Sequence, residues 1–338
     1  MNTLQLINPE TQIIPEVSFE YFSDFAQYRL KQMETGQIFT ENKVRYSAQA
    51  IRIYKSAIIL FKEFELLLQS RIKIHEMNIK ILQAFERFLI SQTSKKTKDY
   101  YSKNTIGKYI AAIKANGNFL HDEGIGLKSV KFSVKTEKQP QIYLSLSELQ
   151  QITNCETLTE GERRATDIFL VQCFTSLRHS TLKKFLKNPF AYVKEHEGKS
   201  FIDVIADKTG EQCVIPLSAV VAQIITKYNG SIDVPSEVYM NSVLKTICRK
   251  AGIDNPVPVR ITKGGMMTEV LVEKFHKVAT NTSRRTFITI IRKYIKDDEA
   301  VTKMTGHTSV NQLKTYSQST KVDEILPYLN NEFFNIEI

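Results

Sequence analysis

Tyr316, close to the C-terminal end, follows a set of basic side chains that together could break a phosphodiester bond without a metal. The set consists of Arg178, Lys208, Arg284 and His307. A phenol has a pKa of about 10, so it attacks a phosphodiester anion only where fixed positive donors stabilise the charge that grows around phosphorus. Arginine suits this task, because its planar fork gives two hydrogen bonds to non-bridging oxygens and keeps its proton at neutral pH.

The charge of the chain favours a polyanionic partner. Lys and Arg number 46 against 36 Asp and Glu, for a formal net charge of +10. Residues 91–140 hold ten lysines against four acidic residues. This run predicts a surface that faces double-stranded DNA, and a solvated helix face followed by a linker is the alternative. The lysines expected to contact DNA are Lys95, Lys96, Lys98, Lys103, Lys108, Lys114, Lys128 and Lys131.

The cysteines and histidines predict no metal and no cofactor. The four cysteines lie far apart, without the paired spacing of a zinc or redox site, and the six histidines are equally scattered. We expect buried thiols in a reducing cytoplasm. No apolar run approaches the roughly 20 residues that span a bilayer, and the N-terminus lacks the basic start of a secretion signal. The expected location is the cytoplasm, in association with the nucleoid, without a membrane partner.

Hydrophobic periodicity predicts that the first part of the chain is all helical. Apolar residues recur at helical spacing in four segments, 18–33, 47–66, 78–90 and 102–121. Amphipathic helices of this length form a small bundle with a shared core. The domain boundaries expected from composition are an N-terminal tail at 1–17, a helical domain at 18–125, a basic linker at 126–142 and a second domain at 143–338.

The second domain is expected to mix helices with short β-hairpins. Ser145 followed by Glu148 forms the pattern of a capping box at a helix start. The β-branched runs 201–205 and 212–216 flank a turn that contains Lys208 and Gly210, which predicts a hairpin. A second hairpin is expected within 257–272, and further helices at 219–228, 238–251 and 284–294. The predicted fold class is therefore mainly α with small β-hairpins (α+β).

Four short motifs resemble those of the tyrosine recombinase, or phage integrase, family. They are Phe174 to Leu182 around Arg178, Lys208-Thr-Gly leading to Ile215-Pro-Leu-Ser218, Asn281 to Thr289 around Arg284, and Thr305-Gly-His307 with Tyr316 nine residues later. Each motif alone is weak, but four in the family's order form a specific pattern. The resemblance covers residues 18–325 and implies a site-specific DNA recombinase.

The resemblance also implies a role for each side chain. Tyr316 would form a 3′-phosphotyrosine bond, and Arg178 and Arg284 would hold the phosphate. Lys208 would protonate the leaving oxygen, and His307 would hydrogen-bond the phosphate and place Tyr316. It further implies a SAM-like core-binding bundle and a catalytic domain that form a C-shaped DNA clamp, and a homo-tetramer acting on paired recombination sites. Accessory DNA-bending proteins are further expected partners.

The sequence departs from the family pattern at two positions. Asn281 occupies the position of the usual histidine, and it can donate a hydrogen bond to phosphate but cannot accept a proton. The general base that accepts the phenol proton would then be His307, solvent, the phosphate itself, or His276 from nearby. Ser176 occupies the place of a glycine, which would cost about 1 kcal/mol if that residue has a positive φ.

Several assignments keep an alternative. Lys263 also sits in an expected hairpin turn and competes with Lys208. Arg285 adjoins Arg284 and is expected to contact phosphate or support the scaffold. The apolar tail 322–338 would dock onto a neighbouring copy or onto its own domain. Only about 17 residues precede the first helix, so no arm-binding domain is expected.

Two other functions remain open. A type IB topoisomerase would use the same side chains to relax DNA, and a catalytically impaired DNA-binding protein of the same fold would retain only binding. A metal-dependent nuclease is disfavoured, because no cluster of Asp, Glu and His has the spacing of metal ligands.

Overall fold

The computed structural model describes residues 17–41, 43–122, 132–134, 136–137 and 141–316, together with the backbone of residues 3–4. The expected DNA contacts Lys128 and Lys131, and the tail 322–338, lie outside the described residues. The chain divides into two compact units. One comprises Met1–Gln139 with Arg260–Val270, and the other comprises Pro140–Val259 with Leu271–Ile338.

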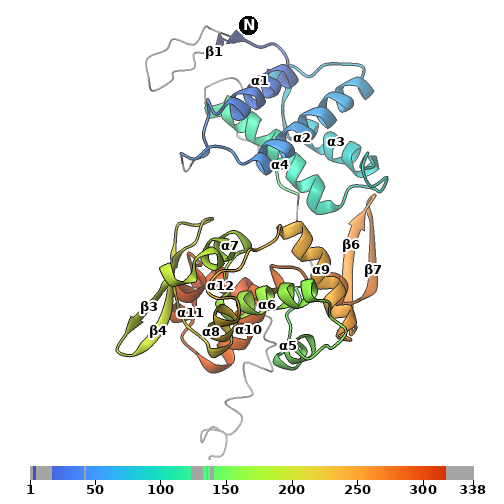
Figure 1. Ribbon diagram of the computed structural model, residues 1–338. Helices are drawn as coiled ribbons and strands as arrows, with labels where there is room; N and C mark the ends of the chain where they lie inside the picture. The colour runs from blue at the N-terminus through green and yellow to red at the C-terminus, as the bar shows by residue number, and fades with distance from the viewer. Residues whose placement is uncertain are drawn as a thin grey trace, which may run out of the picture. The chain divides into compact units, whose positions relative to one another are not determined.

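Four helices build the first unit (Figure 1). They are α1 (Phe22–Thr35), α2 (Ala48–Leu67), α3 (Ile79–Ser91) and α4 (Lys103–Asp122), with the one-turn 3-10 helix η1 (Ile74–Glu76) between α2 and α3 and the short strands β1 (Thr3–Leu4) and β2 (Val17–Ser18) ahead of them. Their apolar faces meet in one core that contains Phe22, Phe25, Phe61 and Phe85. The four helices expected from periodicity are therefore present, because each buries the stripe that the pattern indicated.

The first helix starts later than the pattern indicated. Residues 18–33 were expected to be helical, but α1 begins at Phe22. Tyr21 instead forms a β-bridge with Lys73, and the Phe22 N–H donates to the Ile72 carbonyl at 2.9 Å. Phe19 still packs against the core from outside the helix.

The second unit is a mainly helical body with a small antiparallel sheet (Figure 1). Its helices are α5 (Leu146–Thr153), α6 (Glu160–Thr175), α7 (His179–Lys187), α8 (Ala219–Lys227), α9 (Glu237–Lys250), α10 (Thr282–Tyr294), α11 (Asp298–Thr305) and α12 (Val310–Tyr316), with 3-10 turns η2 (Pro189–Ala191) and η3 (Lys274–Lys277). The predicted capping box is present. The Ser145 N–H donates to Glu148 at 2.7 Å, and the Glu148 N–H donates to the Ser145 hydroxyl at 3.2 Å.

Helix α6 is the central element of this unit and was not predicted. Its middle residues Ile168, Phe169, Leu170 and Val171 are all buried. The second half of the helix, from Ile168 to Thr175, is buried nearly all round and has no polar stripe, so its sequence there lacks the amphipathic period that identified the other helices. Helix α10 packs along α6.

The first predicted hairpin is present. Strands β4 (Lys199–Ile205) and β5 (Gln212–Pro216) pair antiparallel, with Ile202 opposite Ile215 and Val204 opposite Cys213. Ile202, Val204, Cys213 and Ile215 are buried, so one face of the hairpin joins the core. The sequence analysis did not predict β3 (Val193–His196), a largely exposed strand that pairs with β4.

The second predicted hairpin is also present. Strands β6 (Pro256–Lys263) and β7 (Met266–Glu273) are joined through Gly264 and Gly265, both with positive φ. The hairpin tip is part of the first unit. There Lys263 forms an ion pair with Asp99, and the ring of Tyr100 lies so close to Gly264 that an added Cβ would be 3.1 Å from it.

The architecture confirms the predicted fold class, mainly α with small β-hairpins. Within the described residues, no helix combines the length and the apolar character needed to cross a membrane.

Candidate functional site

Arg284 lies in the first turn of α10, where its side chain is only 2% exposed. Its guanidinium is held by backbone and ring acceptors. Nη1 donates to the Ser176 carbonyl, and Nη2 donates to the Thr305 carbonyl at 3.0 Å and to His307 Nε2 at 3.0 Å. The Arg284 Nε is buried and has no hydrogen-bond partner among the described residues. Arg284 is therefore fixed in direction and keeps a donor free.

Arg178 reaches the same place from the turn between α6 and α7. Helix α6 ends at Ser176, which is left-handed with φ 57° and turns the chain so that Arg178 becomes the N-cap residue of α7. The same turn offers the Ser176 carbonyl to Arg284. Arg178 Nη1 is buried and unpartnered within the described part of the chain. The condition considered for Ser176, a positive φ with its cost of about 1 kcal/mol, therefore applies.

His307 follows the end of α11 and is 5% exposed. The helix ends at Gly306, which has φ 60°. A Cβ at Gly306 would lie 2.6 Å from Cys213 Sγ on β5, so the close approach of α11 to the sheet requires glycine. The ring of His307 accepts from Arg284 and contacts the Thr305 hydroxyl through Nδ1 at 2.7 Å.

Tyr316 is the last residue of α12 and is half-buried. Its ring centroid is 4.9 Å from that of His307, with 54° between the planes. The Arg284 guanidinium carbon is 5.7 Å from the centre of the Tyr316 ring. Because α10, α11 and α12 pack against one another, residues from three helices converge here (Figure 1).

The site is strongly electropositive, with no counter-charge among the described residues. Burial, followed by the nearby Arg178 charge, lowers the pKa of Arg284 to about 10. Burial, followed by the charges of Arg284 and Arg178, lowers the pKa of His307 to about 3, so its ring is neutral at pH 7. Neither arginine forms an ion pair with any carboxylate of the described residues. Buried cations without a carboxylate are costly, so this arrangement indicates a site for an anion.

Lys208 is exposed in the turn between β4 and β5, in the unit that carries both arginines. The turn is held near them, because the Asp207 N–H donates to the Thr181 hydroxyl in the first turn of α7 at 3.2 Å. On its other side, Ala206 lies against Gly306. The competing Lys263 belongs to the first unit and pairs with Asp99.

The structure gives the remaining candidates at α10 different positions. Asn281 is the exposed N-cap residue of α10, three residues before Arg284, and its side chain makes no capping hydrogen bond. His276 is exposed and contacts Glu273 at 3.2 Å. Arg285 is half-buried, and its pKa is lowered by burial and raised by the neighbouring Tyr316. Arg285 therefore lies near Tyr316.

The described lysines of the expected DNA surface belong to α4 and the loop before it. Lys95, Lys96, Lys98 and Lys108 are exposed, while Lys103 and Lys114 are half-buried. Lys95 pairs with Glu63 at 3.0 Å. Lys114 donates to the Phe132 carbonyl at 3.0 Å, which ties it to the segment after α4.

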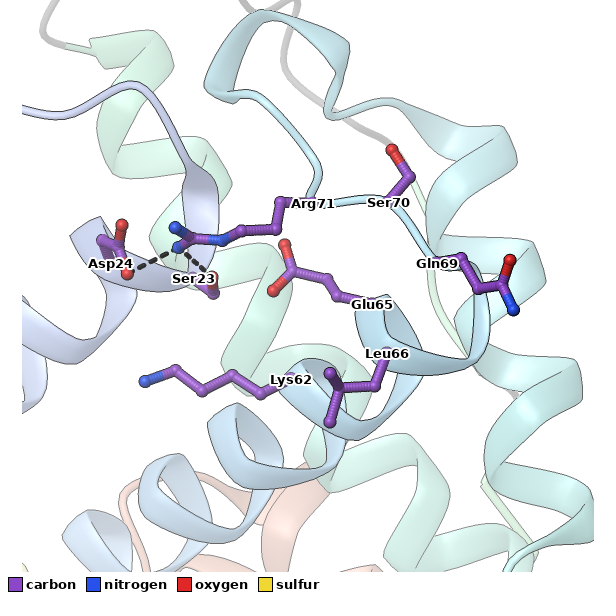
Figure 2. A pocket seen from close by; sticks show the side chains of 8 residues that line it. All are labelled: Ser23, Asp24, Lys62, Glu65, Leu66, Gln69, Ser70 and Arg71. Carbon is purple, nitrogen blue, oxygen red and sulfur yellow. Dashed lines mark hydrogen bonds and ion pairs between the residues drawn. The ribbon is translucent and has the colours of Figure 1, made fainter.

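A hollow of about 580 Å³ in the first unit offers a contrast (Figure 2). It also contains an arginine, but Arg71 pairs with Asp24 at 2.6 Å and donates to the Ser23 hydroxyl at 3.2 Å. Glu65 is buried beside it and accepts from the Ile72 N–H at 2.9 Å. The charge of Arg71 is therefore balanced by a carboxylate, unlike the charges of Arg178 and Arg284.

Sequence reasoning did not identify Thr305 and Cys213. The Thr305 hydroxyl hydrogen-bonds with the ring of His307, and the Thr305 carbonyl accepts from Arg284. Cys213 lies beside Gly306. Thr305 adjoins Gly306 and His307 in the sequence, but nothing in that spacing indicates where its hydroxyl points. Within the described residues, no three His, Cys, Asp or Glu side chains come together as metal ligands would.

Comparisons with known proteins place the chain in a structural class. Residues 16–126 match the phage integrase SAM-like domain. The XerH site-specific recombinase, in a post-cleavage complex with its palindromic difH substrate, shares 14% identity at a TM-score of 0.60, with 91% of this chain and 94% of that chain covered. The chain has the tyrosine recombinase fold.

Two further solved structures agree with this fold. The Tn1549 transposon integrase with a circular intermediate DNA has 11% identity and a TM-score of 0.60, covering 94% of this chain and 100% of that one. A lambda integrase dimer on a COC′ core site has 13% identity and a TM-score of 0.59, covering 93% and 79%. A comparison with curated proteins finds no match. The resemblance seen in the sequence is confirmed.

Proposed function

We propose that this protein is a site-specific DNA recombinase that cleaves and rejoins strands through a 3′-phosphotyrosine bond on Tyr316. The observation that carries the proposal is the pair of arginines, Arg178 and Arg284, which lie beside that tyrosine and pair with no carboxylate in the described part of the chain. A phosphodiester supplies the missing negative charge, and the phenol supplies the nucleophile. The tyrosine recombinase fold supports this reading of the site.

In the proposed reaction, Arg178 and Arg284 donate to the non-bridging oxygens and stabilise the pentacoordinate phosphorane. Tyr316 attacks in line, which forms the bond from Oη to phosphorus and breaks the bond from phosphorus to the 5′-oxygen. Lys208, on its exposed turn, protonates the leaving 5′-oxygen. The phosphotyrosine keeps the energy of the phosphodiester, so attack by a 5′-hydroxyl of a partner strand needs neither ATP nor a metal.

The proposed substrate is double-stranded DNA with paired sites, bound by both units. The exposed lysines before and within α4 would contact phosphates, and Arg285 would add a contact near Tyr316. Among the related structures, XerH is bound to its difH substrate and a lambda integrase tetramer is bound to a Holliday junction. By analogy, we propose that this chain acts as a homo-tetramer in the cytoplasm on DNA of the nucleoid, with or without accessory DNA-bending proteins.

One observation favours a second candidate, a DNA-binding protein of the same fold that does not turn over. Asn281, at the family's usual histidine position, is exposed and cannot accept a proton. If no other group accepts the phenol proton, cleavage will be slow while DNA binding persists.

Covalent trapping tests the proposal. The protein and its Tyr316→Phe variant are incubated with sheared DNA from the source genome, denatured in detergent, and any DNA still attached to protein is recovered and sequenced. We expect adducts with defined junctions from the wild type only. Good DNA binding without adducts from either protein would support the binding candidate, and rejoining without exchange between sites would indicate a topoisomerase.

A further inference from the structure

The two ring nitrogens of His307 face different partners. Nδ1 lies 2.7 Å from the Thr305 hydroxyl, and Nε2 lies 3.0 Å from Arg284 Nη2, which is 3.5 Å from Nδ1. The Thr305 hydroxyl also lies 2.9 Å from the Val301 carbonyl, one turn back in α11. It is also 3.3 Å from the Thr302 carbonyl, and Thr305 is 1% exposed, so its hydroxyl contacts acceptors of α11 and the His307 ring.

Donor and acceptor chemistry allows one assignment in which every hydrogen is used. A guanidinium N–H can only donate, so Nε2 must present its lone pair to Arg284. A neutral ring has one N–H, which then lies on Nδ1 and donates to the Thr305 oxygen. The Thr305 hydroxyl hydrogen in turn donates to the Val301 carbonyl. The opposite tautomer would set the Nε2 hydrogen against the guanidinium hydrogens.

We propose that Thr305 is a positioning residue that, together with the Arg284 donor, holds His307 in the Nδ1–H tautomer and so leaves Nε2 as the proton acceptor of the ring in the reaction centre. The reaction role rests on the proposed function, while the tautomer does not. The ionisable groups that face His307 are Arg284 on α10, Arg178 before α7 and Tyr316 on α12, with Cys213 on β5 beneath the adjoining Gly306.

This tautomer supplies the acceptor that Asn281 lacks. In the empty site the lone pair of Nε2 accepts from Arg284 Nη2, so in this proposal that N–H first turns to a non-bridging oxygen of the bound phosphate. As Oη of Tyr316 then bonds to phosphorus, its proton passes to Nε2 of His307, and the 5′-oxygen leaves with the electron pair of its bond and takes a proton from Lys208. The resulting imidazolium keeps its Nδ1–H bond to Thr305. A phosphate between Arg178 and Arg284 offsets the two charges that oppose protonation of His307 in the empty site.

Nitrogen NMR on protein labelled with 15N-histidine tests the tautomer without any DNA. The His307 signal is assigned by its loss in His307→Gln. We expect a protonated Nδ1 and an unprotonated Nε2 in the wild type and in Thr305→Ser, which keeps the hydroxyl. In Thr305→Val the two nitrogen shifts should move toward each other as the Nε2–H form gains population. An Nε2–H wild type, or a Thr305→Val spectrum like the wild type, would overturn the proposal.

Thr302→Val is the matched control. Thr302 lies on the same helix and makes the same kind of bond, from its hydroxyl to the Asp298 carbonyl at 2.7 Å, but its side chain makes no hydrogen bond to His307. Its His307 spectrum should match the wild type. A shift like that of Thr305→Val would mean that the spectrum reports the packing of α11 rather than the hydroxyl, and would count against Thr305.

The reaction role is tested on whichever genomic fragment the trapping experiment recovers. Loss of the group that orients a histidine commonly costs about 10-fold to 100-fold. We expect adduct formation to slow by that factor in Thr305→Val, with Thr305→Ser and Thr302→Val near the wild type. Equal rates in Thr305→Val would refute the reaction role. A wild type that forms no adducts but shows the Nδ1–H tautomer would remove the proposed function and leave the positioning of His307 intact.

Discussion

At the scale of single residues, the central feature is a buried guanidinium that the protein fixes in place and that forms no ion pair with a carboxylate among the described residues. Arg284 donates to two backbone carbonyls and one ring nitrogen. A lysine offers a single point of charge without the planar fork, so it cannot satisfy these three acceptors and a phosphate together.

Arg284→Lys should therefore lower the rate of adduct formation by about 100-fold or more, in the range found when one donor to a developing oxyanion is removed. Arg285→Lys, at the adjoining half-buried position, is the matched control and should lose less than about tenfold. The fraction of protein linked to DNA is measured against time. An Arg284→Lys variant as fast as the wild type would remove Arg284 from the reaction.

His307 also makes stability depend on pH. Its pKa is about 3 in the folded protein, because of burial and then the charges of Arg284 and Arg178, against about 6.5 when unfolded. The unfolded chain thus takes up the proton first, and this contribution to stability is complete above pH 6.5 and is lost as the pH falls toward 3.

The expected loss for this one group at pH 5.5, relative to pH 8, is about 1 kcal/mol in the free energy of unfolding. Urea denaturation at both pH values measures it. In His307→Gln the difference between the two pH values should shrink by about that amount, since the remaining groups titrate alike in both proteins. An unchanged difference would mean that His307 is protonated in the fold.

At the scale of elements, the contact between the end of α11 and β5 sets the position of His307. Gly306 combines a left-handed backbone with a site where an added Cβ would lie 2.6 Å from Cys213 Sγ. Gly198, in the turn between β3 and β4, has φ 72° and open space around it. The two glycines therefore separate backbone strain from crowding.

Gly198→Ala should cost about 1 to 2 kcal/mol of stability, from the left-handed backbone alone. Gly306→Ala should cost more, because Cys213 must also move. In the double variant Gly306→Ala with Cys213→Ala, the stability lost to crowding should be recovered, with a coupling energy of about 1 kcal/mol or more. Urea denaturation of the single and double variants gives the cycle. Equal costs at the two glycines, with no coupling to Cys213, would contradict the packing described.

Some of the helices, strands and site contacts could be predicted from the sequence, and others could not. The hairpin at Lys208 and the four N-terminal helices follow from local patterns, since strand alternation and helical periodicity are properties of neighbouring residues. Helix α6 was not found because its second half is buried nearly all round, which removes the amphipathic period there. The contact between Thr305 and His307 was not found because it depends on side-chain directions at a helix end.

At the scale of the whole molecule, the net charge of +10 should make DNA binding salt-dependent. Each phosphate contact changes the slope of log affinity against log salt concentration by about 0.9 for duplex DNA. The exposed lysines Lys96, Lys98 and Lys108 lie before and within α4. They are the residues with which to test whether this surface contacts the duplex.

Replacing all three with glutamine should reduce the slope by about 2 to 3. The control replaces three other exposed lysines of the same unit, Lys31, Lys55 and Lys80, and should leave the slope closer to that of the wild type. Fluorescence anisotropy with a duplex of arbitrary sequence provides the affinities. Equal slopes for the two triple variants would remove the α4 surface from the DNA contact.

Strand cleavage by Tyr316 is tested by identifying the residue that becomes covalently joined to DNA. Protein trapped on genomic DNA is digested with nuclease and then protease, and the peptide that carries a residual nucleotide is sequenced by mass spectrometry. We expect the nucleotide to be attached to Tyr316 through its 3′-phosphate. Attachment to another residue, or through a 5′-phosphate, would contradict it.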